Sequence, residues 1–308
     1  MIGGVLMNKS NILLSLLVFI LQFSFLVPET SAQDKIPARS VPIKVKKRVK
    51  PLREMHVSKD TLSFSFSLPS TFQQTKRSYI VDSLSLLAPL FNHLRDIRNG
   101  YSEDTVRIVH IGDSHIRGHI YPRTVGNALT EAFGAVSYTD MGVNGATCLT
   151  FTHPERIAEI AALKPELLIL SFGTNESHNR RNNSNIHYNQ MDELVTLLRD
   201  SLPHVPILLT TPPGSYESFR QRRRRVTYAI NPRTDIAART IMRFAKNHDL
   251  LAWDLYNAVG GKQRACLNWT SSNLMRPDHV HYLPEGYILQ GNLLYQALIQ
   301  AYNDYVSQ

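Results

Sequence analysis

Cysteine is nearly absent from this sequence, since the chain of 308 residues contains only Cys148 and Cys266. Two cysteines cannot build the disulfide framework that stabilises small secreted scaffolds, so a hydrophobic core must stabilise the chain. The sequence does not show whether the two Cα atoms approach within bonding distance. One disulfide and two free thiols therefore both remain possible.

The sequence also lacks an apolar run as long as a membrane-spanning helix needs. Residues 12–27 are almost entirely apolar, but these sixteen residues are fewer than the roughly 20 that a span requires. Lys9 precedes the run, and small residues at 30–32 follow it. This order predicts a secretory signal peptide over residues 1–32, cleaved after Ala32, and an exported protein, periplasmic or secreted. The alternative is a single membrane anchor.

Internal repeats are absent, and positive charge is concentrated in two places. The formal net charge is +9, and residues 33–60 contain nine lysines or arginines against three acidic residues. This segment contains prolines and few large apolar residues, which predicts a basic extended linker. The linker could make electrostatic contact with an anionic envelope polymer or a membrane surface, or it could be a solvated tether.

The second concentration is the run from Arg220 to Arg225, which contains five arginines. We expect a solvated loop here, with contact to an anionic polymer as the alternative. Nucleic acid is not an expected partner, because the exported chain has no motif of interleaved aromatic and basic residues.

Residues 61–308 are predicted to form a single α/β domain. Strands are expected at residues 106–111, 136–139, 167–172, 206–211 and 250–253, and helices at 122–133, 154–163, 188–201, 233–247 and 285–302. This alternation predicts a three-layer α/β/α sandwich with a parallel sheet of about five strands. Two elements should precede it: a half-buried strand at residues 62–68 and a helix at residues 79–98, which Pro89 must kink or restart.

Polar segments follow three of the predicted strands. Gly112-Asp113-Ser114 follows the first strand, Gly142-Val143-Asn144-Gly145 the second, and Gly173-Thr174-Asn175-Glu176 the third. A fourth segment, Asp278-His279-Val280-His281, lies between prolines just before the last helix. Because ligands of open parallel sheets bind at the carboxyl ends of the strands, we expect the three segments that follow strands to line one site.

The four segments resemble the sequence blocks of the SGNH, or GDSL, esterase and lipase superfamily, which carry a catalytic serine, a glycine, an asparagine and a histidine in that order. Ser114, Gly145, Asn175 and His281 match block by block. The resemblance covers about residues 107–308 and implies a flavodoxin-like sheet and a carboxylic ester hydrolase. His115 after the serine and Glu176 in the third block depart from the common pattern. The Gly-Asp-Ser-His block resembles the branch with envelope peptidoglycan and polysaccharide O-acetylesterases.

The chemistry of these residue types gives each a role. A serine hydroxyl needs an adjacent base, and histidine, with an ordinary pKa of about 6.5, suits this task, so His281 is the predicted base for Ser114. Asp278 would orient the imidazole while it remains ionised. The backbone N–H groups of Ser114 and Gly145 and the side-chain amide of Asn175 would form the oxyanion hole.

Some of these assignments have alternatives. Asp278 could cap the last helix, and Asn175 could be a turn residue at a strand end. His279 could replace His281 as the base, although it departs from the Asp-x-x-His spacing. Asp113 is expected to bond the backbone and is not the predicted triad acid.

A metal site is the rival interpretation of the histidines. His110, His115 and His119 could bind a metal together with Asp113, but side chains from a strand and a sharp turn should diverge. We therefore expect neither a metal nor a cofactor.

The sequence thus predicts an exported serine esterase that hydrolyses small acyl esters through a Ser114 acyl-enzyme. The preferred substrate is an O-acetylated glycan such as peptidoglycan or another polysaccharide. A lipase or lysophospholipase is an alternative, but it would need an extended apolar groove, whereas the loop at residues 179–189 is polar. A glycan O-acetyltransferase would use the same residues. A non-catalytic carbohydrate-binding module would not need all four blocks.

Overall fold

The computed structural model describes residues 60–220 and 226–308, all of which belong to one compact unit. The predicted signal peptide at 1–32, nearly all of the predicted linker at 33–60 and the arginines at 222–225 lie outside the described residues. Within the described part of the chain, no helix is long and apolar enough to cross a membrane.

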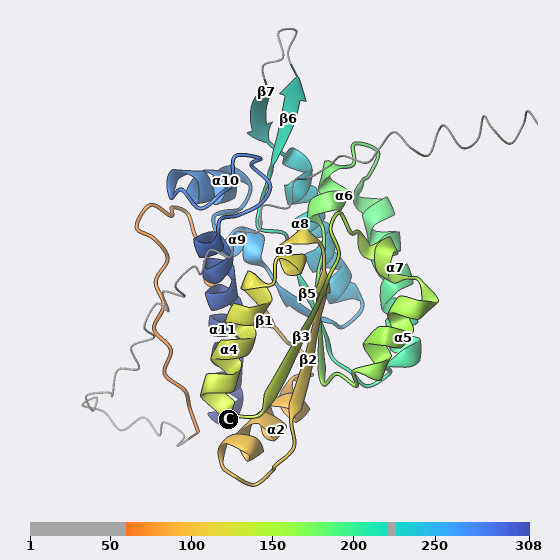
Figure 1. Cartoon of the computed structure of the whole chain (residues 1–308), viewed down its shortest axis with the longest axis vertical. Helices are drawn as coiled ribbons and strands as arrows, with labels where there is room; N and C mark the ends of the chain where they lie inside the picture. The colour runs from red at the N-terminus through yellow and green to blue at the C-terminus, as the bar shows by residue number, and fades with distance from the viewer. Residues whose placement is uncertain (1–59, 221–225) are drawn as a thin grey trace, which may run out of the picture. The chain divides into compact units, whose positions relative to one another are not determined.

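Six strands of the described residues form the main sheet (Figure 1). They are β1 (Ile80–Val81), β2 (Val106–Gly112), β3 (Val136–Gly142), β4 (Leu167–Ser171), β5 (Ile207–Thr210) and β8 (Leu251–Trp253), in the spatial order β1-β8-β5-β4-β2-β3. Only β1 pairs antiparallel, at the edge beside β8. The other strands are parallel and lie in the flavodoxin-like order. The predicted parallel α/β fold is confirmed.

Both faces of the sheet are buried, because alternate residues of a strand enter two separate hydrophobic cores. In β2, Val106 and Ile108 enter one core, whereas Val109 and Ile111 enter the other. Each fully buried side chain of this size contributes roughly 1.5–3 kcal/mol to stability.

Helices cover each face of the sheet and complete the three layers (Figure 1). The first core is covered by α2 (Ala88–Arg98), α4 (Ile120–Phe133) and α11 (Pro284–Val306), and the second mainly by α5 (Pro154–Ala162), α7 (Ser184–Ser201) and α8 (Pro232–Asn247). Proline occupies the first turn of α5, α8 and α11, where its missing N–H costs no helical hydrogen bond. These starts lie within four residues of the predicted ones.

The predicted strand at residues 62–68 is wrong in one respect. Its alternation is real, because Leu62, Phe64, Phe66 and Leu68 pack against the core while the serines between them are exposed. The segment nevertheless pairs with no strand of the described residues. It is held partly by Asn303 of α11, whose side chain bonds the Leu62 backbone N–H and carbonyl at 2.7 and 2.8 Å.

The predicted helix at residues 79–98 is shorter than expected. Only Ala88–Arg98 is helical, with Pro89 in its first turn, so the proline begins the helix. The preceding residues Ile80–Val81 form β1 instead.

A two-stranded hairpin that the sequence did not predict flanks the arginine run, whereas the predicted loop itself lies, apart from Arg220, outside the described residues. It consists of β6 (Tyr216–Arg220) and β7 (Val226–Ile230), paired antiparallel. Figure 1 shows it projecting beyond the helices at the end of the sheet where α6 (Thr174–His178) and α10 (Gly261–Ser271) lie.

The cysteines do not pair. Cys148 and Cys266 are separate buried thiols, so the structure has two free thiols and not a disulfide. The Cys266 thiol donates to the Ser215 carbonyl at 3.4 Å.

Candidate active site

Ser114 lies at the sharp turn between β2 and the short helix α3 (Ser114–Arg117). The buried Asp113 caps this helix, because its Oδ1 accepts the His115 backbone N–H at 2.9 Å. A glycine is needed at the end of β3, since a Cβ on Gly142 would lie 2.1 Å from the Arg117 backbone nitrogen. The close approach of β3 to α3 and the Asp113 cap therefore fix the turn that presents Ser114.

His281 and Asp278 lie next to Ser114, although 167 residues separate the serine from the histidine in sequence. His281 Nε2 is 2.8 Å from Ser114 Oγ, and its Nδ1 is 2.9 Å from Asp278 Oδ2. Asp278 Oδ1 accepts the backbone N–H groups of Val280 and His281 at 2.9 and 2.8 Å. Asp278 thus caps its own loop and bonds the imidazole, whereas Leu283 is the N-cap residue of α11.

The charge on Asp278 is stabilised locally. Partial burial opposes its ionisation, but hydrogen bonds from the backbone N–H groups of His281 and Val280 and from the His281 ring outweigh it, so the pKa of Asp278 lies below its ordinary value. An ionised carboxylate at this position can stabilise an imidazolium.

His279 is directed toward the hairpin. Its carbonyl accepts the Tyr216 N–H at 2.9 Å, and its ring lies 4.2 Å from the Tyr228 ring and 5.1 Å from the Tyr216 ring, measured between centroids. The ring that bonds Ser114 is that of His281.

Asn175 and Gly145 lie on adjoining segments at the same edge of the sheet, where β3 and β4 end. Asn175, in α6, donates from Nδ2 to the Ala146 carbonyl at 2.8 Å and lies 3.5 Å from Asp113 Oδ2. Its side chain is therefore in contact with the Gly145 segment and the serine turn. Gly145 is exposed, has φ +73°, and has open space where a Cβ would lie. That both groups donate to an oxyanion stays a prediction.

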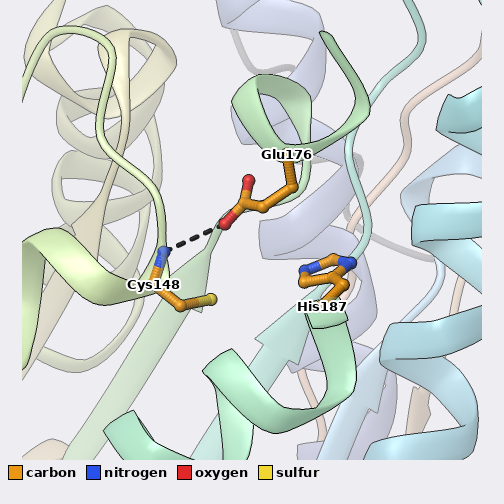
Figure 2. Close-up of side chains that lie close together, drawn as sticks. All are labelled: Cys148, Glu176 and His187. Atoms are coloured by element: carbon orange, nitrogen blue, oxygen red, sulfur yellow. Dashed lines mark hydrogen bonds between the residues drawn. The ribbon is translucent and has the colours of Figure 1, made fainter. Parts of the chain in front are cut away.

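Glu176 connects two of these segments, a role that the sequence did not reveal. Its Oε1 accepts the Cys148 N–H at 2.9 Å (Figure 2), and its Oε2 accepts the Gly173 N–H at 2.8 Å. Cys148 begins the short helix η2 (Cys148–Phe151), which follows Gly145, and Gly173 precedes Asn175. The buried carboxylate thereby holds the glycine and asparagine segments together.

Cys148, Glu176 and His187 are the one group of three potential metal ligands found among the described residues, with ligand atoms within 4.8 Å of one another. Figure 2 shows a ring nitrogen of His187 directed toward the other two side chains. Both Glu176 oxygens already accept backbone N–H groups, and burial next to Glu176 raises the pKa of the Cys148 thiol well above its ordinary value. A zinc site needs a thiolate, which this environment disfavours, so the donor set fits a metal poorly.

The histidines of the rival metal interpretation diverge. His110 bonds Tyr138 and Ser171 at 2.8 and 2.7 Å, His115 bonds Tyr287 at 3.1 Å, and His119 bonds Asp140 at 2.6 Å. Each ring thus has its own protein partner.

Asp113 and His115, the two neighbours of Ser114 in the chain, line a small cavity of about 20 Å³. Burial, with His281 nearby, lowers the pKa of His115 to about 3, so its ring is neutral. The ring lies 5.6 Å from that of His281 and adds no positive charge beside it. Burial also raises the pKa of Asp113 to about 7.

The sequence matches the model of the GDSL-like lipase/acylhydrolase family over residues 110–289. The match covers more than half of the chain, and the chain therefore belongs to this family. It contains the predicted serine, glycine, asparagine and histidine blocks. The protein is accordingly a carboxylic ester hydrolase.

Solved structures of low sequence identity are similar to this chain, and the first of them shares its fold. A peptidoglycan O-acetylesterase has 17% identity and a TM-score of 0.65, over 73% of this chain and 99% of the other. A carbohydrate esterase family 3 protein from Talaromyces cellulolyticus has 15% identity and a TM-score of 0.48, over 65% of this chain and 99% of its own. A GDSL-like lipase from Bacteroides thetaiotaomicron has 19% identity and a TM-score of 0.46, over 70% and 99%. No curated protein matches the sequence.

Proposed function

We propose that the protein hydrolyses small acyl esters, above all acetyl esters, through an acyl-enzyme on Ser114. The observation that carries this proposal is the continuous chain of hydrogen bonds from Ser114 Oγ through the His281 ring to Asp278, with distances of 2.8 and 2.9 Å. Nucleophile, base and orienting carboxylate are thus within the distances that proton transfer requires.

The reaction proceeds in two halves. Ser114 Oγ attacks the ester carbonyl while its proton passes to His281 Nε2, and the oxyanion takes hydrogen bonds from the Ser114 and Gly145 N–H groups and the Asn175 amide. The C–O bond to the alcohol then breaks, and the alcohol leaves with the proton from His281. Water attacks the acyl-enzyme with His281 again as base, which releases the carboxylic acid and restores Ser114.

The proposed substrate is an O-acetylated glycan outside the cytoplasm, such as peptidoglycan or another polysaccharide. The predicted signal peptide and the Gly-Asp-Ser-His block support this choice. The surroundings of Asn175 support it as well, because Asn179, Arg180 and Arg181 are polar and exposed. A long acyl chain would need an apolar groove instead. The peptidoglycan O-acetylesterase of similar fold acts on a substrate of this class.

The test measures acetate released from O-acetylated peptidoglycan and from acetylated xylan, and p-nitrophenol released from p-nitrophenyl palmitate, with Ser114→Ala as the control. We expect acetate release that depends on Ser114 and little turnover of the palmitate. Good turnover of the palmitate with no release from either glycan would overturn the glycan proposal in favour of a lipase. Acetyl transfer to an added sugar in excess of acetate release would indicate a transferase.

A further inference from the structure

The residues at the base of the β6–β7 hairpin are hydrogen-bonded both to the loop that contains His281 and to the helix that contains Asn175. On one side, Tyr216 donates its backbone N–H to His279, which lies between Asp278 and His281. On the other side, Ser215 Oγ lies 3.0 Å from His178 Nε2 in α6, the helix that carries Asn175. The hairpin therefore starts next to the active site.

The strand register assigns side chains to the two faces of the hairpin. Ser218 pairs with Tyr228 and Arg220 with Val226, so these side chains share the face that contacts His279 through Tyr228. Phe219 lies on the opposite face, where the Arg180 guanidinium is 5.8 Å from its ring centroid. Arg180 itself follows α6. One face of the hairpin thus lies next to the loop at residues 278–281, and the other lies next to the segment that follows Asn175.

Each of the two faces of the hairpin combines an exposed aromatic ring with a positive charge that has no ion-pair partner among the described residues. Phe219 and Tyr228 are 38% and 41% exposed, a large fraction for aromatic residues. Arg180 and Arg220 are exposed, and among the described residues no carboxylate lies within ion-pair distance of either. The one carboxylate of the hairpin, Glu217, is neutralised by Arg233 at 2.8 Å. Aromatic faces pack against the C–H faces of sugar rings, and guanidinium groups bind carboxylates.

We propose that the β6–β7 hairpin, together with Arg180, is the polymer-binding arm of the active site and selects a glycan chain that carries carboxylate groups. This inference rests on the proposed function. A polymer whose acetyl group reaches Ser114 would extend along the hairpin, with sugar rings against Tyr228 or Phe219 and acidic groups near Arg180 and Arg220. A neutral acetylated glycan would gain only the aromatic contacts.

The kinetic test compares the wild type with the double variant Arg180→Glu/Arg220→Glu. The control is Arg243→Glu, because Arg243 is also exposed and also lies over an aromatic ring, that of Tyr188 at 5.2 Å, but belongs to α8. The readout is kcat/KM on O-acetylated peptidoglycan, which carries carboxylates, divided by kcat/KM on p-nitrophenyl acetate. We expect this ratio to fall about tenfold at low salt in the double variant, as the loss of two exposed charge pairs implies, and to change little in the control.

An unchanged ratio in an active double variant would overturn the inference and leave the proposed esterase function intact. An equal fall on neutral acetylated xylan would also overturn it, because carboxylate selection would then be absent. If the wild type hydrolysed neither ester, the proposed function itself would fail.

A binding test does not depend on turnover. Ser114→Ala protein, with and without the two charge reversals, is sedimented with insoluble peptidoglycan and with phosphatidylglycerol vesicles. The predicted basic linker is the same in both proteins, so a difference between them reports on the arm alone. Weaker pelleting of the reversed variant with peptidoglycan supports the inference. Equal pelleting with peptidoglycan, or an effect confined to the vesicles, which would indicate a membrane-binding surface, contradicts it.

Discussion

Glu176→Gln tests whether one buried carboxylate holds the predicted oxyanion donors in place. The two carboxylate oxygens accept the Cys148 and Gly173 N–H groups at 2.9 and 2.8 Å, and the side chain is only 2% exposed. In glutamine one oxygen becomes an NH₂ group, which cannot accept a hydrogen bond. One buried N–H then loses its acceptor and faces another donor.

The expected loss of stability follows from that contact. A hydrogen bond to a charged acceptor contributes about 1.5–3 kcal/mol, and an unsatisfied buried donor costs about 1–3 kcal/mol, so we expect a loss of roughly 3 kcal/mol. Activity should fall further than stability alone explains, because displacing a positioning group by about 1 Å can cost about 100-fold. The predicted oxyanion donors Gly145 and Asn175 lie on the two segments that Glu176 joins.

The assay combines urea unfolding with kcat on p-nitrophenyl acetate, measured where both proteins are fully folded. The control is Glu193→Gln, an exposed glutamate of α7, which makes the same chemical change at the surface. We expect lower stability and a lower kcat for Glu176→Gln, with little change in KM, and neither effect for the control. A Glu176→Gln protein as stable and as active as the wild type would show that Glu176 does not hold the two segments in place.

Three further predictions concern the residues around the serine. Because burial raises the pKa of Asp113 from 3.8 to about 7, the folded protein binds one more proton than the unfolded chain between these values, and its stability should fall as pH rises through this range. In urea titrations, the free energy of unfolding of the wild type minus that of Asp113→Asn should therefore drop by about 4 kcal/mol between pH 4 and pH 8. A difference that stays constant with pH would contradict this prediction. Gly145→Ala should lower the free energy of unfolding by about 1–2 kcal/mol, because of the positive φ at this position and without any steric clash. Gly142→Ala should fail to give soluble protein, because its Cβ would meet the Arg117 backbone. Equal yields and melting temperatures of the two variants would contradict this prediction. In Asp278→Asn the side-chain oxygen can still accept the loop N–H groups, but the negative charge beside His281 is lost. We therefore expect kcat on p-nitrophenyl acetate to fall about 1,000-fold or more in a folded protein. A loss below tenfold would show that the carboxylate is dispensable.

The sheet was predictable because its information is local. Each parallel strand is a short apolar run that ends in small polar residues, and the spacing between runs leaves room for a helix. The serine, glycine and asparagine blocks could be assigned to one edge of the sheet for the same reason, since the ends of parallel strands meet there. The histidine block follows no strand, and only the family resemblance connected it with the other three. The hydrogen bonds among Ser114, His281 and Asp278 agree with that placement.

What sequence reasoning missed depends on partners that are distant in the chain. The alternation at residues 62–68 identifies a half-buried extended segment, but only the tertiary structure shows that Asn303, and not a neighbouring strand, bonds it. The role of Glu176 requires the Cys148 backbone, 28 residues away. The hairpin was missed because its two strands flank the arginines, which make residues 216–230 look like a charged loop.

In the proposed mechanism Ser114 and His281 act as one nucleophilic unit, and a double-mutant cycle on p-nitrophenyl acetate measures this coupling. Ser114→Ala and His281→Ala should each lower kcat about 1,000-fold or more, and the double variant should be no slower than Ser114→Ala alone, because the histidine has no proton to accept once the hydroxyl is gone. Multiplicative losses, or a Ser114→Ala protein as active as the wild type, would contradict the account.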